Sequence, residues 1–479
     1  MILTKKKIVI LGAGPAGLTA AYNLSKSDDC EVLILEISDQ VGGMARSFSL
    51  FNQIVDVGPH RFFSSDPRIN KLWLEVVGKE YKMVNRTTRI YYKNKFFNYP
   101  LKALNALINL GLIETVLCVL SYFKAKFFPP KSIHNFETWV VSRFGHRLYS
   151  IFFKDYTEKL WGISCEELGT EFAEQRIKKF SLGEAILALL PFGKNKHKTL
   201  VDQFAYPLGG NGAVYTKMLD LFLKNKGTIK FKTHASNIHF DEQTKEFELT
   251  LNDGSSLRCD HLISSMPVNQ FISIFSNSSS AILKHAENLR FRNTLILYVN
   301  IPKEHLFKDQ WLYIQDKSAL SGRITNFSNW VPEIREGNWG NTVLALEYWC
   351  FENDEIWGMD DVQLKSIAIK DLISCNFIQN ASEVLDFKSL KVPKCYPIYY
   401  GDYKTHLNEI IEFFQPYQNL QLIGRYGSFK YNNQDHSILM GILAAKNIME
   451  DEKNDLWEIN TDYEYQESST ITATGLSLD

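Results

Sequence analysis

The sequence predicts an α/β protein in which a parallel-sheet domain is interrupted by a helical domain and by a domain of antiparallel strands. Three observations lead to this prediction. The first 35 residues alternate strand, helix and strand patterns, residues 101–200 have mostly helical periodicity, and strand patterns recur between residues 228 and 348. A chain of 479 residues exceeds the size of one simple core, so about two domains or more are expected.

Charge and cysteine pattern exclude several classes of function. The formal net charge is −1, so no field over the whole protein attracts nucleic acid. The seven cysteines form no CxxC pair, which argues against a disulfide scaffold and against a zinc site. The amino terminus lacks the layout of a signal peptide. We therefore expect a cytoplasmic protein with reduced thiols, no bound metal and no nucleic-acid partner.

The chain opens with a β-α-β unit that carries a glycine motif. Ile8–Leu11 and Glu31–Leu35 have strand patterns, and Ala16–Leu24 between them has a helical pattern. Residues 12–17 read Gly-Ala-Gly-Pro-Ala-Gly, which is G-x-G-x-x-G placed after a strand and before a helix. This context indicates a dinucleotide-binding unit of the Rossmann type.

Each position of the motif has its own physical role. Gly12 permits the tight turn, Gly14 lets the backbone approach a pyrophosphate, and Gly17 lets helix and strand pack closely. Pro15 and Ala16 begin the helix, whose amino terminus offers free N–H groups to the phosphates.

Two further features extend the dinucleotide site. Glu36 ends the second strand, where its carboxylate can accept both ribose hydroxyls and would repel the 2′-phosphate of NADP. A second glycine pair, Gly42-Gly43, is followed by Met44 and Arg46. A second backbone nest with a cation suits a longer dinucleotide. This extension resembles that of the glutathione-reductase-like FAD proteins, which include amine oxidases, protoporphyrinogen oxidases and UDP-galactopyranose mutases.

Residues 101–200 contain one segment that invites a membrane interpretation. Ala106–Phe123 is largely apolar, but it contains Asn109 and Glu114 and is followed by Lys124. Two polar interruptions in so short a run favour a buried or half-buried helix over a membrane span. Contact with a membrane surface stays open.

The second half of the chain predicts further strands and a return to the first domain. Strand patterns occupy Thr228–Lys232, Phe247–Leu251 before the turn Asn252-Asp253-Gly254, Asn293–Val299, Thr342–Tyr348 and Leu420–Ile423, and a helix pattern occupies Ile438–Met449. We predict a discontinuous FAD-binding domain of residues 1–100, 201–270 and 410–450, a helical substrate domain of 101–200, a sheet-containing substrate domain of 271–409, and a poorly ordered tail of 451–479.

Beyond the glycine motifs, the chain resembles UDP-galactopyranose mutases, especially the long eukaryotic type, over most of residues 1–450. The matching segments are, in order, Val55–His60, Arg89-Ile90 with Asn98–Pro100, Phe136–Trp139, Phe152–Tyr156, Lys159–Gly162, Gln175-Arg176, Trp311–Tyr313 with Arg323 and Asn326, and Gly424–Tyr431 with Asn433–Ser437. Two places depart from the family pattern. Pro59 stands where the family usually has the second glycine of Gly-Gly-His, and the loop after Tyr431 is two residues shorter.

The resemblance implies FAD as the cofactor and assigns residues to it. These are Gly12, Gly14, Pro15, Ala16, Gly17, Glu36, Gly43, Met44, Arg46, His60, Gly424, Arg425, Asn433, Gln434, Asp435 and Ser437. His60 is expected at or near flavin N5, where it could tune the proton. Asp435 is expected to open the last helix, whose terminus stabilises negative charge on a reduced isoalloxazine.

The substrate site is expected to hold a diphosphate. A buried pyrophosphate needs matching cations, ideally planar donors that bind two oxygens, and Arg176 and Arg323 are the candidates. With His60 they form the expected catalytic set. The other residues expected at the substrate are Tyr99, Trp161, Trp311, Tyr313, Tyr396 and Tyr431.

The resemblance implies a nucleotide-sugar mutase that interconverts the pyranose and furanose forms of a UDP-sugar. N5 of the reduced flavin would attack the anomeric carbon and expel the nucleoside diphosphate, with no net redox change. NADPH or NADH is a candidate reductant, although no second G-x-G-x-x-G indicates a nicotinamide domain. Two alternatives remain: an oxidoreductase of the amine-oxidase or protoporphyrinogen-oxidase type, and a non-catalytic FAD-binding or membrane-associated scaffold in polysaccharide assembly. The sequence does not indicate which sugar is bound or the oligomeric state.

Overall fold

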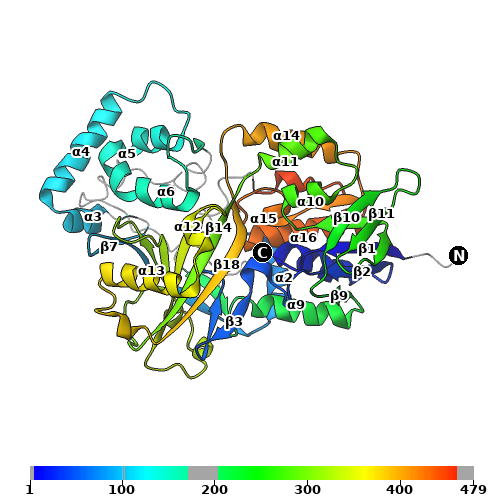
Figure 1. Cartoon of the computed structure of the whole chain (residues 1–479), viewed down its shortest axis with the longest axis horizontal. Helices are drawn as coiled ribbons and strands as arrows, with labels where there is room; N and C mark the ends of the chain where they lie inside the picture. The colour runs from blue at the N-terminus through cyan, green and yellow to red at the C-terminus, as the bar shows by residue number, and fades with distance from the viewer. Residues whose placement is uncertain (1–4, 100, 102, 171–202, 461–479) are drawn as a thin grey trace.

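The first part of the fold is a parallel sheet at the end of the molecule that carries the amino terminus (Figure 1). The computed structural model describes residues 5–99, 101, 103–170 and 203–460. Five strands pair in the order β19-β13-β1-β2-β9, and every pairing is parallel. Their bounds are Lys6–Leu11 (β1), Cys30–Leu35 (β2), Thr228–Lys230 (β9), His261–Ser264 (β13) and Leu420–Leu422 (β19).

Successive side chains of β1 point to opposite faces of the sheet and pack into two different hydrophobic cores, as expected for a sheet covered on both faces. Ile8 and Ile10 pack with the helices α1 (Pro15–Leu24), α2 (Pro67–Val77), α9 (Ala213–Lys224) and α16 (Gln434–Met449). Val9 and Leu11 pack with the strands β10 (Ala235–Phe240), β11 (Phe247–Leu251) and β12 (Ser256–Cys259) and the helices α10 (Val268–Ile274), α11 (Ser280–Glu287) and α14 (Tyr403–Phe414). The predicted β-α-β unit and α/β fold class are confirmed.

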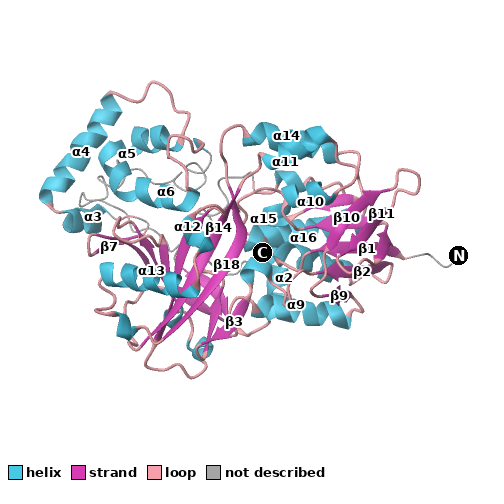
Figure 2. Cartoon of the chain, viewed as in Figure 1, coloured by secondary structure: helices cyan, strands magenta, loops and turns pink. Residues whose placement is uncertain are grey.

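The second part is a seven-stranded sheet with the order β18-β14-β17-β16-β15-β6-β7. The bounds are Thr88–Tyr92 (β6), Lys95–Asn98 (β7), Phe291–Ile301 (β14), Trp311–Ile314 (β15), Arg323–Asn326 (β16), Thr342–Cys350 (β17) and Asp386–Pro397 (β18). All pairings are antiparallel except that of β15 with β6. Figure 2 shows this sheet as the second group of strands, with α13 (Asp361–Ser374) against it. Residues 88–98 therefore belong to the antiparallel sheet, whereas the predicted boundary had placed them in the FAD-binding domain.

The third part is a group of four helices that lies next to the large sheet and away from the parallel sheet (Figure 1). They are α3 (Ala103–Leu110), α4 (Leu112–Phe127), α5 (Phe136–Phe152) and α6 (Lys154–Trp161). The Asn135 side chain accepts from the Thr138 N–H at 2.8 Å and caps α5. A Cβ at Gly145, where φ is +79°, would come within 2.6 Å of the backbone at Ser121 and Tyr122, so the glycine permits the close approach of α4 and α5.

Short elements complete the fold. They are β3 (Ser47–Leu50), β4 (Gln53–Asp56), β5 (Tyr81–Asn85), β8 (Gln203–Pro207), α12 (Glu355–Gly358), α15 (Gly424–Gly427) and the 3₁₀ turns Gly43–Ala45, Phe327–Asn329, Pro332–Arg335, Ala381–Glu383 and Leu456–Glu458. None of the helices in the described ranges combines the length and apolar character needed to cross a bilayer.

Part of the carboxy-terminal segment differs from the prediction. Residues 451–460 were expected to be poorly ordered, but Leu456 is buried and the Lys430 ammonium donates to the carbonyls of Trp457 and Ile459. The stretch is mainly acidic, but its three apolar residues Leu456, Trp457 and Ile459 pack onto the domain. Residues 461–479 lie outside the described ranges.

Candidate active site

The glycine motif forms a turn whose outer side is open. Gly12 has φ of +96°, and a Cβ at Gly17 would lie 2.0 Å from the Gly12 carbonyl oxygen, so both positions require glycine. A Cβ at Gly14 would meet no atom within 4 Å. A Cβ at Gly43 would lie 3.2 Å from Gly14 Cα, so the second glycine turn adjoins the first. The backbone here offers a surface that a pyrophosphate can approach closely.

Glu36 is held beside this turn. The carboxylate is buried and accepts from the Ala13 N–H at 2.6 Å and from the Ser38 N–H at 2.9 Å. Each carboxylate oxygen can accept a second hydrogen bond, so Glu36 still has capacity for ribose hydroxyls. Arg46 donates to the Gly43 carbonyl at 3.0 Å and thus stabilises the second glycine turn.

Buried polar atoms without partners lie around the same unit. Within the described residues, His60 Nδ1, Ser264 Oγ and Asp435 Oδ2 have no hydrogen-bond partner. Ser264 ends β13, and Asp435 lies in the first turn of α16. Buried polar atoms of native proteins almost always have a partner, so these three indicate a polar ligand. The open glycine face, Glu36 and these unpaired atoms together fit an FAD.

Other residues predicted to bind the cofactor have structural partners. The Gln434 amide accepts from the Tyr215 hydroxyl at 2.7 Å and donates to Asn211 Oδ1 at 3.0 Å. The Asn433 N–H donates to His436 Nδ1 at 3.1 Å at the start of α16. These side chains join the α16 terminus to the glycine-rich turn of residues 209–212.

Three more predicted cofactor residues lie near the same elements. The Ser437 N–H donates to the Asn433 carbonyl within the first turn of α16. Met44 Sδ lies 3.8 Å from Cys395 Sγ, so the second glycine turn touches the end of β18. A Cβ at Gly424, where φ is +76°, would lie 3.0 Å from Ala16 Cβ, so α15 approaches the start of α1 closely.

A row of polar residues crosses three strands of the large sheet. The antiparallel register pairs Tyr313 of β15 with Arg323 of β16, and Arg323 with Glu347 of β17. Arg323 Nε donates to Glu347 Oε1 at 2.6 Å and Nη2 to Oε2 at 2.5 Å, which is a bidentate ion pair. Burial alone lowers the pKa of Arg323, but Glu347 and the nearby tyrosines raise this pKa well above its usual value. Arg323 therefore stays charged, and its Nη1 edge is directed away from the carboxylate.

Two predicted substrate tyrosines stack beside a second arginine. The rings of Tyr396 and Tyr431 lie 5.3 Å apart at 11°. The Arg425 guanidinium lies 5.2 Å from each ring centroid and donates to the carbonyls of Asn432 (2.7 and 2.8 Å) and Cys395 (3.3 Å). Arg425 thus ties the loop after α15 to the end of β18 and adds positive charge to the site.

More aromatic residues extend this cluster. The Tyr313 ring lies 4.9 Å from Tyr99 and 5.3 Å from Tyr156, and the Trp161 ring lies 6.0 Å from Tyr431. We call Tyr99, Tyr156, Trp161, Tyr313, Arg323, Tyr396, Arg425 and Tyr431 the arginine–tyrosine cluster.

Two expected substrate residues are not part of this cluster. Trp311 is buried between the rings of Trp330, at 6.0 Å, and Tyr313, at 6.5 Å, so it supports the cluster from the core. Arg176 lies outside the described residues.

His60 lies beside the cluster. Burial lowers its pKa to about 3, with smaller contributions from the positive charges of Arg425 and Arg323. The imidazole is therefore neutral at neutral pH and has one N–H donor and one acceptor nitrogen. The second glycine turn adjoins the cluster through Met44, which contacts Cys395, the residue before Tyr396.

Three residues at this site were not predicted. Glu347 could have been noticed as the only acidic residue in the apolar strand sequence of residues 342–350. Tyr156 lies in a segment that resembles the mutases, but nothing in its local sequence separates it from a core tyrosine. Lys159 has no local signal either, because its partners lie more than 150 residues away.

Lys159 joins the helical group to the large sheet. Its ammonium donates to four backbone carbonyls between β15 and β16, those of Ile314 (3.3 Å), Asp316 (2.9 Å), Ala319 (2.7 Å) and Ser321 (3.4 Å). Burial lowers the pKa of Lys159, and nearby acidic groups oppose this effect. Because Lys159 belongs to the same helix as Tyr156 and Trp161, it fixes that helix against the strands that carry Tyr313 and Arg323.

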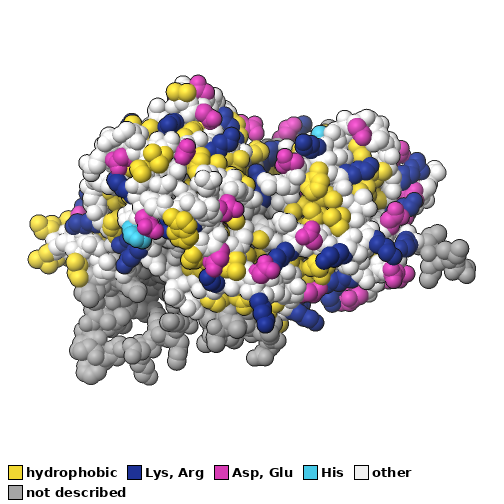
Figure 3. Space-filling view, turned by 90° about the horizontal axis from the view of Figure 1, so that it is seen from below, with side chains coloured by type: hydrophobic (Ala, Val, Ile, Leu, Met, Phe, Trp, Pro, Cys, Tyr) yellow, Lys and Arg dark blue, Asp and Glu magenta, His cyan; other side chains and the backbone are white. Residues whose placement is uncertain are grey.

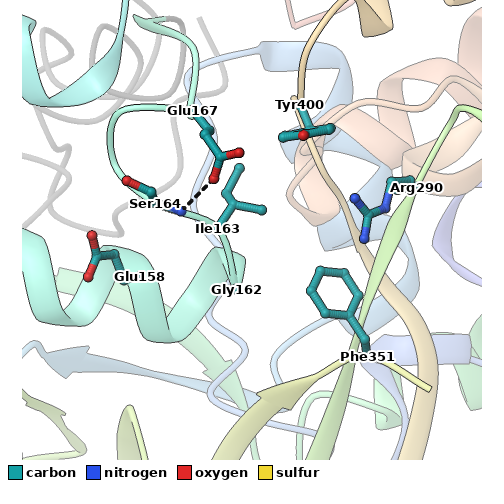
Figure 4. Close-up of a pocket in the computed structure, with 8 residues that line it drawn as sticks. All are labelled: Glu158, Gly162, Ile163, Ser164, Glu167, Arg290, Phe351 and Tyr400. Atoms are coloured by element: carbon teal, nitrogen blue, oxygen red, sulfur yellow. Dashed lines mark hydrogen bonds between the residues drawn. The ribbon is translucent and has the colours of Figure 1, made fainter. Parts of the chain in front are cut away.

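A pocket of about 600 Å³ opens at the end of α6 (Figure 4). Arg290, Phe351 and Tyr400 face Ile163 and Glu167 across it, and the Ser164 N–H donates to Glu167 at 3.3 Å. The lining includes none of the predicted site residues. It borders the arginine–tyrosine cluster, since its residues 162 and 400 directly follow Trp161 and Tyr399, whose rings lie 6.3 Å apart.

Solved structures share this fold. A reduced UDP-galactopyranose mutase aligns with a TM-score of 0.82 at 22% identity and covers 96% of this chain and 97% of that chain. A putative protoporphyrinogen oxidase from Exiguobacterium sp. 255-15 aligns with a TM-score of 0.72 at 15% identity and covers 94% and 100%. At these identities the likeness shows the fold.

Relatives identified by sequence are oxidases. A coproporphyrinogen III oxidase of Staphylococcus aureus is 24% identical over 56% of this chain and 62% of that protein. An L-amino-acid oxidase of Crotalus adamanteus is 33% identical over 19% of this chain and 17% of that protein. Each match covers less than two thirds of the relative's length.

The family itself follows from a match over most of the chain. The model of the flavin containing amine oxidoreductases matches residues 15–449, a range that begins after β1 and includes the other strands of the parallel sheet, the helical group and the large sheet. This protein belongs to the family of flavin containing amine oxidoreductases.

Proposed function

We propose that this protein is an FAD-dependent mutase that interconverts the pyranose and furanose forms of a nucleotide sugar, with a UDP-sugar as the first candidate. The observation that carries the proposal is the arginine–tyrosine cluster beside the cofactor residues. The cluster offers charged guanidinium groups and several hydroxyls, which suit an anionic substrate group such as a diphosphate.

Arg323 is suited to hold a diphosphate. Glu347 binds one edge of the guanidinium, which fixes the orientation of the plane. The remaining N–H groups can donate to phosphate oxygens, and the fixed plane reduces the entropy lost on binding. Arg176 is the second expected cation.

The tyrosines supply neutral donors. Burial raises the pKa of Tyr156 and of Tyr396 well above the usual value, so both hydroxyls keep their protons at neutral pH. A protonated phenol can donate to a phosphate oxygen, and its ring can pack against a sugar or a base. The tyrosines bind and orient the substrate without changing charge.

When bound in its reduced form, FAD supplies the nucleophile that exchanges with the diphosphate at the anomeric carbon. The protein must hold the sugar near the flavin and retain the diphosphate until it returns. The neutral His60 can hold a proton near the flavin without adding charge. NADPH or NADH as the electron source and a cytoplasmic location are part of this proposal.

One observation favours a second function. The relatives identified by sequence are a coproporphyrinogen III oxidase and L-amino-acid oxidases, so an FAD-dependent oxidoreductase is the alternative. Such an enzyme would pass electrons from an organic substrate to an acceptor, and it would not need to bind a diphosphate.

Ligand binding tests the proposal. UDP and a panel of UDP-sugars are added to the purified reduced holoenzyme, and the unfolding temperature is measured for wild type and for Arg323→Lys. We expect UDP to raise the unfolding temperature of wild type, because binding to the folded state stabilises it. The rise should be smaller for Arg323→Lys, which cannot form the bidentate contact. Wild type that responds to coproporphyrinogen but to no UDP compound would favour the oxidase.

A further inference from the structure

Helix α4 turns its apolar face outward. The exposed positions Leu112, Ile113, Val116, Leu117, Leu120, Phe123 and Phe127 recur at the three- and four-residue spacing of one helix face. The side chains that the helix buries, Cys118 and Ala125, are small. In most globular proteins the large apolar stripe of a helix faces the core, so α4 shows the opposite arrangement.

The apolar surface extends beyond the helix. Leu112 is 81% exposed, Phe127 is 72% exposed, and the adjoining Phe128 and Ile108 are 79% and 70% exposed. We call these residues and the exposed face of α4 the α4 surface. Nine large apolar side chains are exposed together here, and a contiguous apolar patch of this kind marks an interaction surface. Figure 3 shows hydrophobic side chains projecting at the end of the molecule where α3 and α4 lie in Figure 1.

The sequence around the α4 surface is basic. Residues 93–135 contain six lysines and one acidic residue, in a chain whose net charge is −1. Lys124, Lys126 and Lys131 are exposed at the carboxyl end of α4 and beyond it. The one acidic residue, Glu114, is paired with Arg147, so it does not offset the lysines.

We propose that the α4 surface docks this protein on a membrane that contains anionic lipids. An exposed apolar helix face flanked by lysines suits the boundary between acyl chains and anionic headgroups. A symmetric dimer through this face would bring the lysines of both copies into one interface, and that accumulation of positive charge disfavours the contact. The helix has 16 residues, so it lies in the interface and does not span the bilayer.

Docking at α4 would orient the active site relative to the membrane. α4 packs against α5 at the close approach of Gly145, and α6 with Tyr156 and Trp161 follows α5 in the chain. The membrane contact is therefore one helix away from the helix that lines the candidate active site. The docking proposal concerns a surface outside that site and does not depend on which reaction the protein catalyses.

Vesicle flotation with the oxidised full-length holoprotein tests this proposal. The protein is mixed with phosphatidylcholine vesicles and with phosphatidylcholine–phosphatidylglycerol vesicles, at low and high salt. We expect flotation with the anionic vesicles, and weaker binding at high salt because lysine attraction is screened. Protein that stays at the bottom of the gradient with both vesicle types would overturn the proposal.

Two double variants separate the apolar and charged parts. Leu112→Ser with Phe127→Ser should weaken binding at least about tenfold for each side chain removed. Lys124→Glu with Lys126→Glu should abolish the preference for anionic vesicles. The matched controls, Val362→Ser (76% exposed on α13) and Lys224→Glu with Lys226→Glu, should bind like wild type.

The molar mass in solution tests whether a second copy of the chain, and not a membrane, covers the α4 surface. We expect a mass, measured by light scattering without vesicles, that is the same for wild type and for Leu112→Ser with Phe127→Ser. A wild-type dimer that this double variant dissociates would show that a second copy covers the α4 surface, and it would overturn the membrane assignment.

Discussion

The ion pair of Arg323 and Glu347 is the residue-scale feature on which the proposed chemistry depends. The strand register makes these residues neighbours. Both side chains are largely buried, so each charge needs the other to offset the cost of leaving water. Sequence patterns suggested Arg323 but did not reveal that a carboxylate already binds one side of it. The pairing explains how a largely buried guanidinium stays charged and oriented before substrate arrives.

Removing Arg323 should lower turnover because a phosphate contact is lost, and should lower stability because Glu347 loses its partner. Arg323→Ala should lower kcat/KM by about 30- to 1000-fold, which corresponds to about 2–4 kcal/mol for a buried charge-assisted contact, while the flavin absorbance stays intact. It should also cost about 3–5 kcal/mol of unfolding free energy, because Glu347 is left buried and unpaired. Kinetics and urea unfolding measure the two effects.

The double variant Arg323→Ala with Glu347→Gln is the control. It should regain most of the stability but none of the turnover, because the buried charge is gone and the phosphate donor is still missing. Recovery of turnover in this variant would show that Arg323 has only a structural role.

We predict that the raised pKa of the buried Asp56 carboxyl makes the free energy of unfolding depend on pH. Burial raises its pKa to about 7 despite hydrogen bonds from Ser47, Tyr206 and Asn211. Its folded-state pKa lies above the unfolded value of 3.8, so its contribution to stability falls as pH rises from about 4 to about 7. The largest slope for one proton is about 1.4 kcal/mol per pH unit.

The Asp56→Asn variant isolates this effect. His60, with a pKa lowered to about 3, acts in the opposite direction, since its contribution is lost as pH falls below 6.5. The difference in unfolding free energy between wild type and Asp56→Asn, measured from pH 4 to pH 8, removes the His60 part. We expect wild type to lose stability relative to the variant as pH rises, and a constant difference would contradict the assignment.

At the scale of elements, two glycines at the start of α1 have different roles: Gly17 is needed for folding, and Gly14 is needed for cofactor binding. Gly17→Ala should destabilise the protein strongly, because the new Cβ would lie 2.0 Å from the Gly12 oxygen. Gly14→Ala should fold normally, because its Cβ meets no protein atom within 4 Å, but should lose FAD because the methyl group occupies the pyrophosphate position. Circular dichroism and bound-flavin absorbance check both variants. Full flavin content in folded Gly14→Ala would place the phosphates elsewhere.

Lys159 should act as a positioning residue between α6 and the β15–β16 connection. Lys159→Met removes the ammonium that binds four carbonyls, so Tyr313 and Arg323 should lose their alignment with α6. We expect UDP affinity to fall about tenfold or more, consistent with the loss of a buried charged hydrogen-bond donor. Titration of the holoenzyme with UDP measures this change.

Lys154→Met on the same helix is the matched control, since the Lys154 side chain is 44% exposed and pairs weakly with Glu158 at 4.0 Å. It should bind UDP like wild type, and the flavin spectrum should be unchanged in both variants. Equal UDP affinities for Lys159→Met and wild type would show that Lys159 stabilises the fold alone.

Local sequence patterns predicted individual helices, strands and turns better than they predicted which distant residues these elements contact. The β-α-β unit, the glycine turns and the last helix follow from spacing, because their determinants lie within a few residues of one another. The parallel pairing of β6 with β15 joins residues more than 200 positions apart, so no local pattern could place residues 88–98 in the large sheet. The four carbonyl partners of Lys159 were not predicted either, because they lie more than 150 residues away in the sequence.

At the scale of the whole molecule, family membership defines the fold and the flavin but not the reaction. The relatives identified by sequence are oxidases, and a mutase shares the fold over nearly the whole chain. The proposed mutase reaction therefore rests on the arginine–tyrosine cluster, which suits a substrate with a diphosphate. The α4 surface adds a second whole-molecule feature, since its outward orientation was not predictable from the apolar sequence of residues 106–123.

The central claim is that the reduced protein isomerises a nucleotide sugar without net oxidation. The direct measurement is an anaerobic incubation of dithionite-reduced holoenzyme with UDP-galactose and other UDP-sugars, followed by chromatography of the products and by the flavin spectrum. The account predicts a furanose product over many turnovers, while the flavin returns to its reduced spectrum after each turnover and the oxidised enzyme is inactive. It is contradicted if no UDP-sugar is converted and the oxidised enzyme instead consumes oxygen with a porphyrinogen or an amine.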